Sequence, residues 1–277
     1  MSTSPTISFI GAGNMASAII GGMLDNGYKA GDIWVSAPDD GHLQAIRKRF
    51  GVSVTTDNRY CAQQADIVIL AVKPQVMADV CRDIAPVVQN TRPLMVSIAA
   101  GLTAETLDEW LGGGLPMVRV MPNTPSLVGK GAAGLFANSQ VKDDQKKMVQ
   151  AVFESIGSAL WVEDENLLHG VTALSGSGPA YFFLMLEALE AAATEAGIEP
   201  VTARELAIQT MAGAAEMAAR SEHDPAQLKR NVMSPGGTTE QAINTFEEGG
   251  LRDLVKKAYG AAFKRSEEMA EELAGKQ

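Results

Sequence analysis

The residues with the clearest chemical meaning form a glycine-rich stretch near the N-terminus. The apolar run Ile7–Ile10 leads into Gly11-Ala12-Gly13-Asn14-Met15-Ala16, and an apolar helical pattern follows. A G-x-G-x-x-A loop between a strand and a helix is typical of a dinucleotide-binding site. Gly11 permits the tight turn, and Gly13 lets the backbone approach a pyrophosphate at the helix N-terminus. The alternative is a glycine turn without a ligand, but the flanking strand and helix favour the cofactor site.

The end of the second predicted strand indicates which dinucleotide is bound. NAD-binding chains place a carboxylate there to hold the ribose 2′-hydroxyl. This chain instead has Val35-Ser36-Ala37-Pro38. A serine leaves room for a 2′-phosphate, so the sequence predicts NADP(H), with NAD(H) accepted at lower preference. Asp39 and Asp40 follow closely, and their carboxylates favour NAD(H) instead. The basic run Arg47–Arg49 either adds positive charge to the site or forms a solvated face.

A second loop with chemical potential is Ser234-Pro235-Gly236-Gly237-Thr238-Thr239-Glu240-Gln241. Its glycines open a loop, and Thr238 with Gln241 matches a capping box for the helix that follows. Free N–H groups at a helix start can bind a carboxylate, and a well-capped helix without a ligand is the alternative. A similar loop, Ser175–Tyr181, either allows close helix packing or lies beside a bound molecule.

The residue types that usually drive catalysis are not arranged in any recognisable pattern. The sequence contains no Ser–His–acid arrangement, no obvious catalytic lysine and no histidine spacing that predicts a metal site, since His42, His169 and His223 are scattered. Reduction of an aldehyde or ketone usually needs an acid near the oxygen. A protonated imine is already electrophilic and needs only binding, orientation and a hydrogen bond to its nitrogen. Backbone amides and threonine hydroxyls suit that chemistry.

The elements that must position these loops alternate between strand and helix in the first 160 or so residues. Such alternation predicts βαβ units and a parallel sheet, as in a Rossmann-type α/β domain. The predicted strands are Thr6–Ile10, Ile33–Ser36, Val52–Thr55, Asp66–Val72, Leu94–Ile98 and Val118–Met121, with Gly131–Phe136 and Ala159–Val162 as extensions. The predicted helices are Asn14–Asn26, Gly41–Phe50, Val76–Val88, Thr103–Leu111 and Asp143–Ile156.

After the acidic stretch Glu163–Glu165 the pattern becomes entirely helical. The segment Ala180–Ala196 is apolar on almost every face, and a helix of this kind must be buried. Because the region is small, we expect a second copy of the chain to cover it, which predicts a homodimer. Thr202–Arg220 and Gly250–Leu273 are further helices. The predicted domains are residues 1–163, which bind the dinucleotide, and residues 164–277, which are all-α and dimerise.

Composition narrows the class of partner and the compartment. The formal charge is −10 and 46% of the residues are hydrophobic. Nucleic acids and anionic membranes need a basic face, so neither is an expected partner. Cys61 and Cys81 are the only cysteines, which fits a reducing compartment. With no predicted signal peptide and no membrane span, the sequence predicts a cytoplasmic protein.

Six motifs together resemble the pyrroline-5-carboxylate reductase family, and the similarity extends from about Thr6 to about Leu273. They are Gly11–Ala16, Ala71–Pro74, Ser97–Gly101, Met121–Pro125, Ser175–Tyr181 and Ser234–Thr239. The resemblance implies NAD(P)H-dependent reduction of L-1-pyrroline-5-carboxylate to L-proline, the last step of proline biosynthesis. It also implies dimers with interlocking C-terminal domains, which many family members assemble into a decamer.

The resemblance also implies roles for individual residues. Thr239 would be the catalytic residue, with its hydroxyl on the ring nitrogen. The substrate carboxylate would be held by backbone around Ser234, Gly237 and Thr238, with Asn231 and Glu165 nearby, Glu165 from the same chain or its partner. The cofactor would be bound by Gly11, Ala12, Gly13, Asn14, Met15, Ser36, Asn58, Ala71, Val72, Lys73, Pro74 and Ala99, the last of these near the nicotinamide.

Two alternative functions are also compatible with the glycine-rich loop. A β-hydroxyacid dehydrogenase would have a lysine in the helix after its second glycine-rich motif, where this chain has Tyr181–Leu186 without one. A non-catalytic dinucleotide-binding sensor would have no need of both Ser234–Thr239 and the apolar helix.

Overall fold

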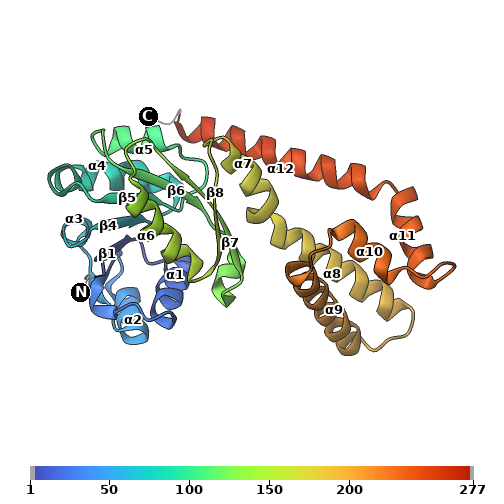
Figure 1. The fold of residues 1–277 in the computed structure, drawn as a ribbon. Coiled ribbons are helices and arrows are strands. Elements are labelled where there is room, and N and C mark those ends of the chain that lie inside the picture. The colour runs from blue at the N-terminus through green and yellow to red at the C-terminus, as the bar shows by residue number, and fades with distance from the viewer. Residues whose placement is uncertain (1–3, 275–277) are drawn as a thin grey trace. The chain divides into compact units, whose positions relative to one another are not determined.

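All eight predicted strands come together in one sheet. The computed structural model describes residues 4–274. The described residues form two compact units, residues 4–177 with 262–274 and residues 178–261 (Figure 1). In the first unit, eight strands lie in the order β3-β2-β1-β4-β5-β6-β7-β8. Their bounds are β1 Ile7–Ile10, β2 Ile33–Ser36, β3 Ser53–Thr55, β4 Ile67–Leu70, β5 Leu94–Ser97, β6 Met117–Met121, β7 Gly131–Ala137 and β8 Gly157–Trp161.

The sheet is parallel from β3 to β6 but not at its other edge. Strand β7 pairs with β6 in the antiparallel direction, and β8 then pairs parallel with β7. The sequence predicts these two strands as extensions of the sheet without giving their direction, and the structure shows that the first of them reverses it. The link from Met121 to Gly131 holds only the short helix η2 (Thr124–Val128), which is less than the dozen or so residues that a parallel crossover needs.

Helices cover both faces of the sheet, and the strand sequences require this. Successive residues of β4 alternate between two hydrophobic clusters, with Ile67 and Ile69 in one and Val68 and Leu70 in the other. Continuous apolar strands of this kind are typical of parallel sheets buried on both sides. The covering helices are α1 Asn14–Asp25, α2 Asp40–Phe50, α3 Asn58–Gln63, α4 Pro74–Thr91, α5 Ala104–Trp110 and α6 Asp143–Glu154. Of these, only the short α3 was not predicted.

The remaining elements are helical, as the sequence predicts after residue 163. In the first unit, α7 (Leu167–Val171) continues into a short π-helical turn, Thr172–Gly176. The second unit contains α8 Gly178–Glu195, α9 Pro200–Arg220, α10 Pro225–Val232, α11 Thr238–Glu248 and the start of α12 Leu251–Ala274. The later part of α12 packs on the first unit, where Leu273 joins a core cluster. No helix within residues 4–274 combines the length and apolar character needed to span a bilayer.

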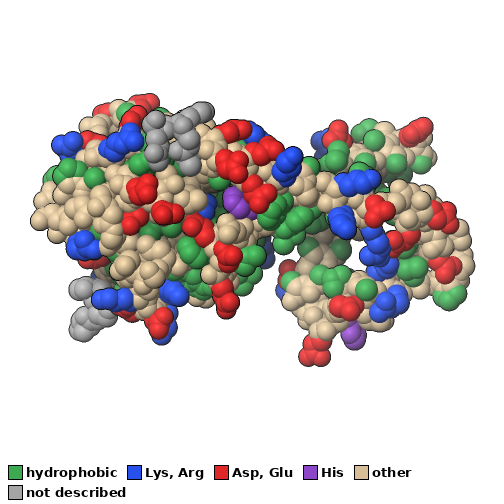
Figure 2. Space-filling view, turned by 90° about the horizontal axis from the view of Figure 1, so that it is seen from above, with side chains coloured by type: hydrophobic (Ala, Val, Ile, Leu, Met, Phe, Trp, Pro, Cys, Tyr) green, Lys and Arg blue, Asp and Glu red, His purple; other side chains and the backbone are tan. Residues whose placement is uncertain are grey.

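Helix α8 is not buried within a single chain. Phe182, Phe183 and Leu184 are each more than 60% exposed, and Tyr181 is also exposed. Hydrophobic side chains lie at the surface of the helical unit in several places (Figure 2). Monomeric soluble proteins rarely expose contiguous apolar patches of this kind, so this helix needs a cover that one chain does not supply.

Both cysteines are buried thiols with no disulfide between them. Burial raises the pKa of Cys61 and of Cys81 to about 12. Since the thiolate is the reactive form, we expect Ellman's reagent at mildly alkaline pH to react with neither thiol in the native protein. In denaturant both should react. Rapid labelling of the native protein would contradict this description of the core.

Candidate functional site

The turn after β1 brings three strand ends together. Gly11 has φ +111°, and a Cβ placed on it would lie 2.6 Å from the carbonyl oxygen of Ala71. Its N–H donates to the Ser36 carbonyl at the end of β2, with 2.8 Å between N and O. The Ala71 N–H donates in turn to the Ile10 carbonyl at 2.8 Å. Three of the residues predicted to bind a cofactor, Gly11, Ser36 and Ala71, are therefore direct neighbours.

The start of α1 is open to a ligand. Gly13 is the N-cap residue, and no side chain caps the helix. A Cβ on Gly13 would have no atom within 4 Å, so the space beside it is free. The N–H groups of Asn14, Met15 and Ala16 have no acceptor inside the helix, because the first turn never does. These groups and the free space fit the pyrophosphate of a dinucleotide.

Ser36 and Asn58 form the predicted adenosine side of the site. The buried Ser36 hydroxyl donates to Asn58 Oδ1 at 2.8 Å, and this bond joins the end of β2 to the start of α3. The bond uses the amide oxygen of Asn58 and leaves its nitrogen as a donor. A donor beside a serine, with no carboxylate between them, suits a phosphate or a ribose hydroxyl.

His42 is a neighbour of this loop that the sequence analysis missed. Its Nε2 lies 2.7 Å from the carbonyl oxygen of Ala12, so α2 is tied to the glycine-rich loop. Asp39 caps α2 by accepting from the His42 N–H, which accounts for one of the acids near Ser36. The only signal in the sequence was the position of His42 in the first turn after the second strand. The basic residues Arg47–Arg49 lie in the last turn of α2, at the end away from Ser36.

The strand-end residues predicted to face the cofactor begin the next two connections. Lys73 is the N-cap of α4 and Pro74 its first residue. Ala99 follows β5 and donates its N–H to the Ser97 hydroxyl at 3.3 Å. Gly101, at φ +77°, packs against Leu273 of α12, whose Cδ1 would lie 3.0 Å from an added Cβ.

Glu165 lies in the same unit as the cofactor residues and has two strong partners. Its Oε1 accepts from the Ala104 N–H at 2.6 Å and pairs with Arg119 Nη1 at 2.9 Å. Close by, His169 Nδ1 lies 2.9 Å from the Ser266 hydroxyl. Burial lowers the pKa of His169, and the charge of Arg119 lowers it further.

The predicted substrate loop begins α11 in the second unit. Gly237 is the N-cap, and no side chain caps the helix. The predicted capping box of Thr238 and Gln241 is therefore wrong. Thr238 is already the first helical residue, and the Glu240 carboxylate instead accepts from the Gly236 N–H at 2.7 Å. The first-turn N–H groups stay available to a carboxylate.

Asn231, Ser234, Gly237, Thr238 and Thr239 all lie where α10 leads into α11. Asn231 accepts from Gln227 through its Oδ1, and Gly237 N–H donates to the Ser234 carbonyl. The residues predicted to bind substrate thus lie in the segment from the end of α10 to the start of α11, except Glu165, which belongs to the first unit.

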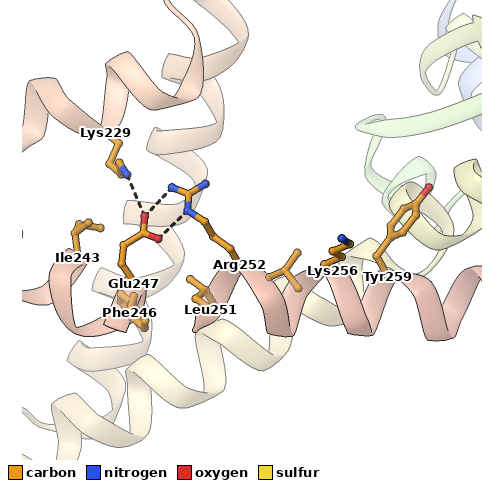
Figure 3. A pocket seen from close by; sticks show the side chains of 9 residues that line it. Lys229, Ile243, Phe246, Glu247, Leu251, Arg252, Lys256 and Tyr259 are labelled. Carbon is orange, nitrogen blue, oxygen red and sulfur yellow. Dashed lines mark hydrogen bonds and ion pairs between the residues drawn. The ribbon is translucent and has the colours of Figure 1, made fainter. Parts of the chain in front are cut away.

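A groove along α11 and α12 has no counterpart among the patterns in the sequence. There Lys229 and Arg252 converge on Glu247 (Figure 3). The hydrogen-bonded Arg252 guanidinium lowers the pKa of the Glu247 carboxyl to about 2. The cluster ties α10, α11 and α12 together.

Among residues 4–274, no group of three His, Cys, Asp or Glu side chains is placed to hold a metal.

Two family models match the chain. A model described as pyrroline-5-carboxylate reductase dimerisation matches residues 165–269, and one described as NADP oxidoreductase, coenzyme F420-dependent, matches residues 6–101. The chain is 46% identical to pyrroline-5-carboxylate reductase of Pseudomonas aeruginosa over 99% of both chains. The enzyme of Vibrio alginolyticus is 45% identical over 95% of this chain and 97% of its own.

Solved structures agree with these matches. The structure of a pyrroline-5-carboxylate reductase from Coxiella burnetii has a TM-score of 0.94 at 44% identity, and covers 97% of this chain and 99% of its own. That of Plasmodium falciparum pyrroline carboxylate reductase with NADP bound has a TM-score of 0.84 at 32% identity, over 96% and 98%.

The chain belongs to the pyrroline-5-carboxylate reductase family. Membership confirms the resemblance found in the six motifs, and it sets aside the β-hydroxyacid dehydrogenase reading. An N-terminal α/β dinucleotide-binding domain is followed by the helical dimerisation domain of this family.

The two glycines of the cofactor loop should respond differently to an added methyl group. Gly11→Ala places a Cβ against backbone at a φ that L residues rarely adopt, so we expect a loss of about 2 kcal/mol or more in the free energy of unfolding. Gly13→Ala should cost about 1 kcal/mol or less, yet weaken dinucleotide binding because the methyl enters the free space. Urea unfolding and cofactor titration measure both. Equal stability of the two variants would contradict the described turn.

His169 should make stability depend on pH. Because its pKa is lower in the folded protein than its ordinary 6.5, the unfolded chain binds the proton more readily. Stability is therefore complete above that value and falls as the pH drops toward the folded pKa. We expect urea midpoints to decrease between about pH 7.5 and about pH 5.5, and to decrease less in His169→Gln. An identical decrease in both proteins would assign the effect to other groups.

Proposed function

We propose that this protein reduces L-1-pyrroline-5-carboxylate to L-proline with NADPH, as the last step of proline biosynthesis. The observation that carries the proposal is the uncapped start of α11 beside Gly236 and Gly237, in a chain that belongs to this family over nearly its full length. The donors at this site are backbone N–H groups and hydroxyls, and such donors suit an imine better than a carbonyl.

On the cofactor side, backbone at Gly11, Ala12, Gly13, Asn14 and Met15 holds the pyrophosphate. Ser36 and Asn58 bind the adenosine ribose and its 2′-phosphate, and this makes NADP(H) the preferred cofactor over NAD(H). The nicotinamide half lies along the later strand ends, lined by Ala71, Val72, Lys73, Pro74 and Ala99. The hydrogen bond between Ser36 and Asn58 supports this assignment, because it leaves amide donors where an NAD-binding chain has a carboxylate.

On the substrate side, the carboxylate accepts hydrogen bonds from the backbone around Ser234, Gly237 and Thr238. The Thr239 hydroxyl holds the ring nitrogen, and Asn231 and Glu165 lie near the ring. When bound, the reduced cofactor supplies a hydride to C5 of the protonated ring. The protein holds C5 at the right distance from the nicotinamide and keeps the iminium oriented. Catalysis of this kind comes from proximity and orientation.

The helical domain, residues 164–277, forms a homodimer, and its partner chain covers the apolar side chains of α8. The higher assembly that we propose for these dimers is a decamer. The acidic charge of −10 speaks against nucleic-acid and anionic-membrane partners. The protein works in the cytoplasm, where reducing conditions keep both cysteines as thiols.

Thr239 gives the sharpest test of the reaction site. Thr239→Ala removes the hydroxyl from the ring nitrogen, so we expect kcat to fall at least about tenfold while NADPH affinity changes less than about twofold. Thr239→Ser should recover much of the loss. Thr245→Ala is the matched control, since its hydroxyl bonds only the Gln241 carbonyl on the same helix. A folded Thr239→Ala enzyme with equal losses in turnover and NADPH affinity would refute the assignment.

Ser36 tests the cofactor preference. Ser36→Asp puts a carboxylate where the 2′-phosphate lies, so the ratio of kcat/KM for NADPH to that for NADH should fall at least about tenfold. Ser36→Asn has nearly the same size and no charge, and serves as the control. If the two variants shift the ratio equally, charge at this position does not select the cofactor.

A further inference from the structure

A single carboxylate oxygen joins three segments of the first unit. Glu165 Oε1 accepts from the backbone N–H of Ala104 at 2.6 Å and from Arg119 Nη1 at 2.9 Å. Arg119 comes from β6, Glu165 follows β8, and Ala104 is the first residue of α5. The chain separates Glu165 from Ala104 by 61 positions and from Arg119 by 46, so this contact is made only in the folded unit.

The segment that Glu165 fixes is the loop of residues 98–103 between β5 and α5. One end of the loop is held by the bond from the Ala99 N–H to the Ser97 hydroxyl. Its middle is held at Gly101, whose backbone lies against Leu273. Its other end is held by Glu165 at Ala104. The Thr103 hydroxyl also caps α5 at this end by accepting from the Thr106 N–H. Ala99, the residue proposed beside the nicotinamide, therefore lies in a loop whose far end Glu165 helps to hold.

Arg119 in turn depends on Glu165. Its side chain is only 8% exposed, and its Nε has no hydrogen-bond partner among the described residues. A guanidinium this deeply buried needs its carboxylate, since an unpaired buried charge is costly. The pairing therefore keeps the Glu165 carboxylate directed at the Ala104 N–H.

We propose that Glu165, held by Arg119, is a positioning residue for the nicotinamide half of the cofactor. It fixes the end of loop 98–103 and so the distance across which hydride is transferred, without giving a proton or a charge to the reaction. The inference rests on the proposed function and gives Glu165 a task beyond lying near the substrate. Hydride transfer is sensitive to such placement, since an error of about 1 Å can cost about 10²-fold in rate.

Three variants test the proposal. Glu165→Ala removes the bridge, Glu165→Gln keeps an acceptor for Ala104, and Arg119→Met with Glu165→Met removes the bridge and leaves no orphaned charge. We expect Glu165→Ala and the double variant to lose at least about tenfold in kcat, and Glu165→Gln to lie between them and wild type. The primary isotope effect with C4-deuterated NADPH should rise in the slow variants. The Kd of 2′,5′-ADP, which reports only the adenosine half, should stay within about twofold.

Arg265→Met is the control, because it breaks exposed ion pairs with Glu268 and Glu272 on α12. Wild-type kcat in folded Glu165→Ala would overturn the proposal. So would a rise in KM for the imine with kcat unchanged, or a parallel loss of 2′,5′-ADP binding. If Glu165→Gln failed to fold, the pair would be structural only, and the proposal would also fall. Failure of the proposed function is separate, since the wild-type protein would then show no turnover.

Discussion

The backbone of Gly11 passes so close to the backbone of Ala71 that no side chain fits between them. This approach sets the ends of β1, β2 and β4 beside one another and points the open start of α1 at the same place. The close approach of Gly11 to Ala71 is possible because apolar side chains pack on both faces of the sheet and hold the strands in register. The cofactor side of the protein thus depends on one steric constraint, supported by a core that keeps the strands from moving apart.

The two ligand-binding loops follow the same physical plan. Each begins a helix with a glycine N-cap and no side-chain cap, at Gly13 in α1 and at Gly237 in α11. Both leave first-turn N–H groups that suit an anionic group, for which we propose a pyrophosphate at α1 and a carboxylate at α11. A protein that reduces an imine needs placement more than acid catalysis, so backbone donors are sufficient. The exposed apolar side chains of α8 add a requirement for a second chain, which fits the dimerisation model that matches this region.

Local patterns made much of this structure predictable. The glycine-rich loop, the first six strands and the helical second half follow from residue type and spacing over a few positions. Features that depend on distant partners did not. No local pattern indicates that Glu165 meets Arg119 or that His42 reaches the Ala12 carbonyl. The same holds for the contact of the Glu240 carboxylate with the Gly236 N–H. The length of the connection between β6 and β7 sets the direction of β7, and the residues of the strand itself do not indicate that direction.

The most direct test of the central claim is to follow one deuterium atom. Purified protein would be given pyrroline-5-carboxylate and NADPH deuterated at both C4 positions, and the product analysed by chiral chromatography and mass spectrometry. Hydride transfer to the ring imine predicts L-proline with a single deuterium at C5, formed in step with NADPH oxidation. Unlabelled proline, or no proline from folded protein that binds NADPH, would contradict hydride transfer to the ring imine and with it the proposed function.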